Sequence, residues 1–262
     1  MTELEQSVDF KKGYSQEQQS FRAAVGAWLQ ENAPTGLSIA ADGGPLDPET
    51  QRTLKEFRTK LGANGWLAPT WPREYGGGVL SPALAIIIQE EMSRLSLPAM
   101  GDNYRWIHAV MEWGTEAQRL RYIAPCLRGE TITWQAFTEA DSGSDLSAIK
   151  MTAVLEDGGY VMTGEKAFVT GRFDPDYLWA LAVAGPDPTP PHHLGVFMVD
   201  ASLPGISIKT QRLLTGSERS IYLDNVRVGA DCLVGEAGQG WEIAQSILER
   251  DRGGDVPRPA NH

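Results

Sequence analysis

The pattern of apolar residues changes near Gly129, and this change constrains the fold more than any other feature of the sequence. Before Gly129, apolar residues recur at helical spacing, as Phe21, Val25 and Trp28 do. After it, short runs of β-branched and aromatic residues follow one another with turn signals between them. The chain therefore begins with helices and continues with strands.

Helical periodicity before Gly129 falls in four segments, which are 21–28, 54–61, 82–94 and 104–127. Two segments rich in glycine and proline, 33–48 and 62–78, separate the first three and predict loops. The second of these loops also carries Trp66, Trp71 and Tyr75. Because aromatic residues are uncommon in linkers, we expect a structured loop there.

Strand candidates after Gly129 are 131–138, 159–162, 166–170, 177–184, 194–200, 206–209 and 220–228. Without long helices between them to make parallel crossovers, an antiparallel barrel or sandwich is favoured. Helical periodicity returns at Gly240 and ends at a stretch rich in glycine and proline. We predict an α+β fold with an N-terminal α-helical domain (1–129), an antiparallel β-barrel-like middle domain (130–236), and the start of a C-terminal helical bundle with a tail (237–262).

Charge and composition exclude several classes of function. The chain of 262 residues has a formal charge of −11 and no run of Lys or Arg, so nucleic acid is not an expected partner. Its N-terminus lacks the order of a signal peptide, and its apolar runs are too short for a membrane span, so we expect a cytoplasmic protein. The 2 cysteines and 4 histidines are scattered, and we predict no metal site.

The most informative run is residues 134–145, Trp-Gln-Ala-Phe-Thr-Glu-Ala-Asp-Ser-Gly-Ser-Asp, which precedes the run 159–171, Gly-Tyr-Val-Met-Thr-Gly-Glu-Lys-Ala-Phe-Val-Thr-Gly. Small hydroxyl and glycine residues after a strand leave backbone N–H groups available and let a phosphate or a polar ring approach closely. The same residues also fit an ordinary loop whose side chains satisfy their own turns. The residues alone leave both interpretations open.

These two runs resemble the paired signatures of acyl-CoA dehydrogenases, in which Thr-Glu-x-x-x-Gly-Ser-Asp is followed by Gly-x-Lys-x-x-x-Thr. The resemblance extends from the helix at Phe21 to Gly235-x-x-Gly-x-Gly240-Trp241, which is nearly the whole chain. It implies two helical domains around a β-domain, assembly as a dimer or tetramer, and FAD as the cofactor. The implied reaction is α,β-dehydrogenation of an acyl-CoA thioester, with an electron-accepting flavoprotein as partner.

The resemblance also implies roles for five residues. Phe137 and Thr138 would lie along the flavin ring, with Thr138 bonded to its pyrimidine edge. Ser144 would lie near the flavin pyrophosphate and the acyl-CoA substrate. Phe168 would take the place of a wall aromatic, and Thr170 would lie near flavin N5. A hydrogen-bond donor at N5 or at the pyrimidine edge stabilises the electron density that arrives with a hydride.

Three positions depart from the family pattern. Ala140 and Asp141 stand where Pro and Gly are usual, and Phe168 stands where Trp is common. The Asp141 carboxylate would oppose a dianionic pyrophosphate unless its side chain turns outward.

The family's catalytic base is usually a Glu in the closing helical bundle, and most of that bundle is not in this sequence. We therefore expect a truncated or short-form chain. Some members place the base on the bundle's first helix directly before an Arg, and Asp251-Arg252 occupies that position. The charged run 249–252 also fits the solvated end of a helix.

Three functions follow from the resemblance. The first is an FAD-dependent acyl-CoA dehydrogenase. The second is a non-catalytic subunit or binding module of a heteromeric acyl-CoA dehydrogenase, so that the partner is either another copy of the chain or a related subunit. The third is an oxidase or monooxygenase on the same fold, because a fold does not fix a reaction.

Overall fold

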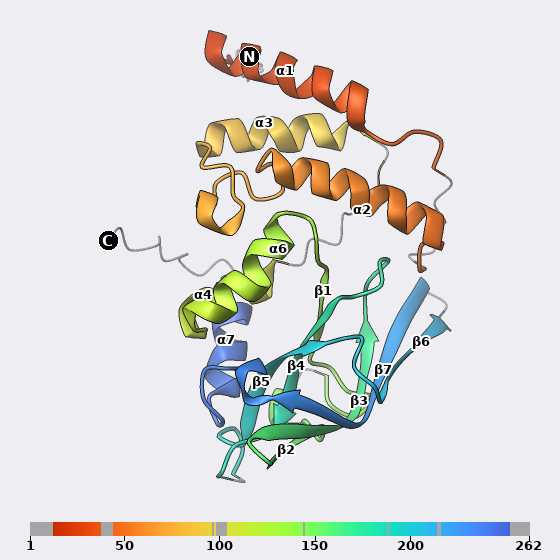
Figure 1. Ribbon diagram of the computed structural model, residues 1–262, viewed down its shortest axis with the longest axis vertical. Helices are drawn as coiled ribbons and strands as arrows, with labels where there is room; N and C mark the ends of the chain where they lie inside the picture. The colour runs from red at the N-terminus through yellow and green to blue at the C-terminus, as the bar shows by residue number, and fades with distance from the viewer. Residues whose placement is uncertain are drawn as a thin grey trace, which may run out of the picture.

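Three helices form a layer at one end of the molecule, which we describe from a computed structural model (Figure 1). The structure describes residues 13–37, 44–95, 97, 104–143, 145–187, 189–213 and 216–251, with the backbone alone for 213 and 248–251. The three helices are α1 (Gln16–Asn32), α2 (Pro48–Ala63) and α3 (Pro82–Ser93). Ser15 caps α1 in a capping box, and Asp47 caps α2 ahead of a proline at its first turn.

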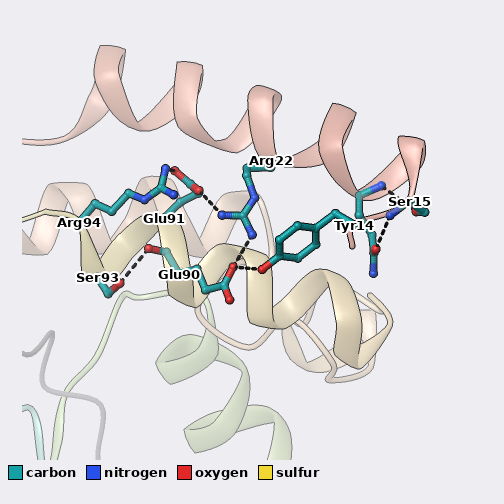
Figure 2. A network of polar contacts seen from close by, with 8 residues as sticks. Tyr14, Ser15, Arg22, Glu90, Glu91, Ser93 and Arg94 are labelled. Carbon is teal, nitrogen blue, oxygen red and sulfur yellow. Dashed lines mark hydrogen bonds and ion pairs between the residues drawn. The ribbon is translucent and has the colours of Figure 1, made fainter. Parts of the chain in front are cut away.

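A polar network joins α1 to α3 (Figure 2). Arg22 on α1 donates to Glu90 and to Glu91, the latter at 2.9 Å. Arg94 donates to the other carboxylate oxygen of Glu91 at 2.8 Å, and the Tyr14 hydroxyl donates to Glu90 at 2.7 Å. Glu91 is only 6% exposed, so two guanidinium groups compensate the burial of its charge.

A second group of helices covers one side of the sheet (Figure 1). The segment predicted as one helix over 104–127 is broken, because Gly114 ends α4 and Thr115 caps a new start. The pieces are α4 (Arg105–Trp113), α5 (Glu116–Gln118), the π-helical η2 (Arg119–Ile123) and α6 (Ala124–Leu127), and helix α7 (Gly240–Asp251) packs against α4. The short 3-10 turns are η1 (Arg73–Tyr75), η3 (Leu146–Ala148) and η4 (Ala230–Cys232).

Over the residues that the structure describes, eight strands form one mixed sheet. They are β1 (Thr133–Ala136), β2 (Thr152–Glu156), β3 (Gly159–Val169), β4 (Tyr177–Val183), β5 (Leu194–Asp200), β6 (Ile206–Leu213), β7 (Gly216–Gly229) and β8 (Leu233–Val234). Their order is β6-β7-β3-β2-β4-β5-β8, and β1 pairs with β4. Both β1 and β2 run parallel to β4, and the other pairs are antiparallel.

The predicted fold class is confirmed, because helices precede a β-domain and a helix follows it. Two details of the sheet differ from the prediction: it is mixed instead of purely antiparallel, and over the described residues it does not close on itself. The candidates 159–162 and 166–170 are parts of one strand, β3, because Gly164 at φ 150° lets the strand continue through a bulge. Strand β2 was not among the predicted strands, because its apolar residues do not alternate with polar ones. It leaves Val154 and Leu155 exposed.

Strands β4 and β5 are buried on both faces. Alternate residues of β4 belong to two hydrophobic clusters, with Leu178 and Ala180 in one and Trp179 and Leu181 in the other. Trp179 and Leu181 pack with residues of α4, α6 and α7. On the other side the sheet curls over itself, so that Tyr160 of β3 meets the ring of Phe197 of β5 edge to face at 5.0 Å between centroids.

The two thiols and the lengths of the helices complete the description of the fold. Cys126 and Cys232 are both buried and form no disulfide. Within the part of the chain that the structure describes, the helices are too short or too polar to cross a bilayer.

Two glycines in helices give a matched test of the packing between α2 and the chain after α6. A Cβ atom added at Gly62 would lie 2.1 Å from the carbonyl oxygen of Arg128, whereas one added at Gly26 in α1 would have its nearest neighbour, Glu91 Oε2, at 3.7 Å. We expect Gly62→Ala to lower the free energy of unfolding by about 1–3 kcal/mol through overpacking. Gly26→Ala should raise it by about 0.5–1 kcal/mol through helix propensity. Urea unfolding of both variants measures the two effects, and equal signs would contradict the packing described.

Candidate functional site

The serine- and glycine-rich run lies in a loop that begins and ends on the same edge of β4. Strand β1 pairs with β4 over Tyr177–Ala180, and β2 meets the same strand at Val183. The chain therefore leaves this edge after Ala136 and returns to it at Thr152. The loop between them, residues 137–151, carries the run predicted to bind a polar ligand.

The carboxylate of Glu139 closes this loop at its base. Its Oε2 accepts a hydrogen bond from the backbone N–H of Lys150 at 2.8 Å, and its Oε1 accepts one from Met151 at 2.9 Å. Glu139 is 7% exposed. One buried side chain thus fixes the distance between the two ends of the loop.

Lys166 of β3 joins the loop to the sheet below it. Its Nζ is fully buried and donates to Glu139 Oε1 at 2.8 Å and to the carbonyl of Phe137 at 3.1 Å. The next residue, Ala167, donates its N–H to the carbonyl of Thr138 at 2.9 Å. Burial lowers the pKa of Lys166 to about 8, while the Glu139 carboxylate opposes that shift. The carbonyls of Phe137 and Thr138 are therefore both bonded to neighbouring residues of β3.

Phe168 lies in a β-bulge with an uncommon backbone conformation. The pairing of β3 with β7 shifts between Lys166 and Val169, and Phe168 between them has φ 55°. A bulky residue at positive φ is strained by roughly 1–3 kcal/mol and persists only where its surroundings fix it. Its ring is 50% exposed. Thr170 lies two residues further along and is exposed, and Thr138 is half-buried on the segment whose carbonyl accepts from Ala167. An exposed aromatic residue and two threonines thus lie on two adjacent, hydrogen-bonded segments.

A glycine and a tryptophan pack tightly beyond the end of β3. A Cβ atom added at Gly171 would lie 2.3 Å from Nε1 of Trp134, so only glycine fits against the indole. Past Gly171, the carbonyl of Arg172 accepts from Leu46 at 3.0 Å, and Asp174 exchanges hydrogen bonds with Gln51 of α2. The chain after Thr170 is thereby attached to the helical layer.

The tip of the loop carries the exposed carboxylate of Asp141 next to the buried hydroxyl of Ser142. Asp141 is exposed and pairs with Lys150 at 2.9 Å, and this cation lowers the pKa of Asp141. Asp141 therefore turns outward, which is the arrangement that its place in the run requires. Ser142 is buried and its Oγ has no partner among the described residues, while Gly143 beside it faces open space.

The residues predicted for the site differ in how the structure places them. Thr138, Phe168 and Thr170 are brought together, as described above. Phe137 is instead buried in the core cluster that includes residues of α4 and α7, and its carbonyl accepts from Lys166. Ser144 lies outside the described residues, and so does the side chain of Asp251, whose backbone ends α7. Over the described chain, no group of three metal-ligating side chains occurs.

The sequence prediction assigned no role to Glu139 and Lys166, although both belong to the paired signatures. A signal was available, because Lys166 directly precedes the apolar run Ala167-Phe168-Val169 within a strand candidate. A lysine that must be buried needs a carboxylate partner, and Glu139 directly follows the neighbouring strand candidate. Spacing alone could not show that the two side chains meet, because they lie 27 residues apart.

The residues present fit an FAD group. A half-exposed aromatic ring suits the face of an isoalloxazine, and the hydroxyls of Thr138 and Thr170 suit its polar edges. The unpartnered Ser142 hydroxyl and the open backbone at Gly143 suit phosphate oxygens.

Comparison with known proteins identifies a family for both halves of the chain. The family model described as "Acyl-CoA dehydrogenase, N-terminal domain" matches residues 15–130, and the one described as "Acyl-CoA dehydrogenase, middle domain" matches residues 135–226. Acyl-CoA dehydrogenase FadE34 of Mycobacterium tuberculosis is 33% identical over 243 residues, which are 90% of this chain and 33% of that protein. Acyl-CoA dehydrogenase IpdE1 of the same organism is 29% identical over 248 residues, which are 91% of this chain and 64% of that protein.

Solved structures agree with these relatives. The acyl-CoA dehydrogenase from Geobacillus kaustophilus has a TM-score of 0.71 at 27% identity, covering 92% of this chain and 64% of that one. A structure described as "Tcur3481-Tcur3483 steroid ACAD" has a TM-score of 0.75 at 25% identity, covering 92% of this chain and 62% of that one. The chain thus spans between one third and two thirds of the length of these relatives.

The buried Lys166 makes a testable prediction about pH. Because its pKa in the fold, about 8, lies below the ordinary value of 10.5, the folded chain binds fewer protons than the unfolded chain between these values. Stability should therefore gain a positive slope with pH from about 8 to about 10.5. Lys166→Met should remove this contribution, and Lys209→Met, at an exposed lysine of β6, should keep it. The free energy of unfolding, measured by urea titration across this range, tests the difference; identical slopes in all three proteins would contradict it.

Proposed function

The chain belongs to the acyl-CoA dehydrogenase family, and we propose that it provides the flavin-facing β-domain of an FAD-dependent acyl-CoA dehydrogenase. The observation that carries this proposal is the half-exposed Phe168, held at positive φ two residues before Thr170 and next to the segment that carries Thr138. The proposed reaction is α,β-dehydrogenation of an acyl-CoA thioester, with electrons passing to a flavoprotein. A cytoplasmic location is part of the proposal.

In this proposal the chain's residues bind and orient one face of FAD. The ring of Phe168 contacts the isoalloxazine, Thr170 donates near N5, and Thr138 donates at the pyrimidine edge, with the Phe137 backbone beside it. Ser144 lies near the pyrophosphate and the acyl-CoA thioester. When bound, FAD accepts the hydride that leaves the β-carbon of the acyl group.

The buried pair beneath the site makes these donors preorganised. Lys166 and Glu139 fix the backbone of Phe137 and Thr138, and the bulge fixes Phe168. The hydroxyl groups therefore do not have to reorganise as negative charge develops on the flavin, which is the condition under which such donors contribute most to a rate.

The α-proton of the substrate requires a base. We retain Asp251, at the end of α7, as the candidate from this chain. A carboxylate serves as base when it reaches the proton and has a suitable pKa.

A second function is favoured by one comparison. The structure described as "Tcur3481-Tcur3483 steroid ACAD" carries two component names. By analogy, the present chain would be a non-catalytic subunit or binding module that completes a site with a related acyl-CoA dehydrogenase subunit. The assembly would then be a hetero-oligomer and not a homo-oligomer. Purification with and without related subunits separates the two functions, because an FAD spectrum and acyl-CoA-dependent bleaching from this chain alone support the first. A spectrum that appears only with a related subunit supports the second.

Removing the two hydroxyls tests the proposal. Thr170→Ala and Thr138→Ala should each slow the reduction of the flavin by acyl-CoA, raising its activation free energy by about 2–4 kcal/mol. The reason is that each donor acts on charge that develops during hydride transfer. The measurement is anaerobic single-turnover reduction at equal FAD occupancy. Thr163→Ala removes an exposed hydroxyl five residues before Phe168 on the same strand, where it accepts from the Asn225 N–H at 3.2 Å, and it should leave the rate unchanged.

The loss should fall on the reduction rate and largely spare folding, since Thr170 is exposed and Thr138 is not part of the buried core. If Thr138→Ala and Thr170→Ala both reduce at the wild-type rate, these residues do not contact the flavin, and the assignment of the site must be withdrawn.

A further inference from the structure

A buried arginine lies beside the end of the strand that carries Phe168 and Thr170. Arg219 of β7 pairs across the sheet with Val169 of β3, and it is 3% exposed. The paired signatures of the family do not include it. Arginine is among the residues least often buried, so its position requires an explanation.

The side chain of Arg219 contacts the residue that follows β3 and the indole of Trp134 in β1. Its Nη2 donates to the carbonyl of Gly171 at 3.1 Å, and its guanidinium lies 5.9 Å from the centroid of the Trp134 ring. Its Nη1 is buried with no hydrogen-bond partner among the described residues. Burial lowers the pKa of Arg219, and the carboxylate of Asp174 only partly offsets this.

This arrangement is unfavourable as a purely structural one. A buried donor without a partner is destabilising, and an apolar side chain of similar length would fill the same space without that cost. The cation has one direct effect on the neighbouring backbone, which is to hold the Gly171 carbonyl. That carbonyl belongs to the residue directly after Thr170.

Gly171 is therefore fixed from two sides. The indole of Trp134 leaves no room for a Cβ atom, and the guanidinium of Arg219 binds the carbonyl. On the other side of the bulge, Lys166 binds the carbonyl of Phe137. Two buried cations thus bracket the strained Phe168, and strain of this kind persists only where the surroundings fix it.

We propose that Arg219 is a positioning residue for the flavin-facing surface, acting through the Gly171 carbonyl on the backbone of Thr170 and Phe168. The inference rests on the proposed function, because it assigns the purpose of the clamp to the hydroxyl and the ring that face FAD. Arg219 itself does not touch the cofactor.

The first test needs no cofactor. Arg219→Met removes the charge and the donors, and Arg227→Met makes the same change on the same strand at an exposed arginine paired with Glu156. Hydrogen exchange of the FAD-free chain should become about tenfold faster across residues 168–172 in Arg219→Met, the change expected for loss of one charged hydrogen bond, and remain at the wild-type rate in Arg227→Met. If Arg219→Met does not fold, Arg219→Lys, which keeps the charge without the planar fork, should show a smaller increase confined to the same residues. Unchanged exchange at 168–172 in the folded variant would overturn the proposal.

The second test is a double-mutant cycle on FAD affinity, measured by fluorescence titration of the assembly in which the chain binds FAD. If Arg219 acts through Thr170, Arg219→Met and Thr170→Ala each lower the affinity for FAD. The loss in the double variant then does not exceed the larger of the two single losses. Additive losses would overturn the positioning role while leaving the flavin assignment intact. A loss in Arg219→Met with no loss in Thr170→Ala would also overturn it. Faster hydrogen exchange at 168–172 in Arg219→Met, together with wild-type FAD affinity in Thr170→Ala, would overturn the proposed contact of Thr170 with FAD. The contact of Arg219 with the Gly171 carbonyl would still stand.

Discussion

The ion pair between Lys166 and Glu139 is the interaction on which the candidate site depends. Both groups are removed from water, and burying two charges is costly unless their geometry is good and their remaining hydrogen-bond capacity is used. Here Glu139 also accepts from two backbone N–H groups, and Lys166 also donates to a backbone carbonyl. The pair therefore fixes three backbone segments, the end of β1, the start of β2 and the middle of β3, in one arrangement. Apolar residues could fill this space, but they could not hold those backbone groups.

This pair explains how a strained residue can persist at the surface. Phe168 has an unfavourable φ and a ring that is half in water, and neither feature stabilises the chain. The residues around it supply the compensation, with Lys166 before the bulge and the contact of Arg219 with Gly171 after it. Fixed aromatic and hydroxyl positions suit a ligand with fixed geometry, which is consistent with the flavin ring that we propose.

Much of the fold could be predicted from the sequence, because the helices of the first half have strong periodicity and clear caps such as Ser15 and Asp47. The family signatures also singled out Thr138, Phe168 and Thr170, and their contact with a flavin stays a prediction. Three features could not be predicted. Strand β2 exposes its apolar residues, the Lys166–Glu139 pair joins residues far apart in sequence, and Phe137 turns its ring into the core although its neighbour faces the site. Each depends on how separate segments meet in space, which periodicity and spacing do not encode.

The central claim is that the surface formed by Phe168, Thr138 and Thr170 is the wall against which the flavin binds. The most direct measurement is the nitrogen-15 NMR shift of N5 in FAD labelled at that atom, bound to the assembly that contains this chain. A hydroxyl donor at N5 changes that shift, so the resonance should move towards the value of an unbonded N5 when Thr170 becomes alanine, and it should not move when Thr163 does. An N5 resonance that is the same in the wild type and in the Thr170 variant would contradict the account.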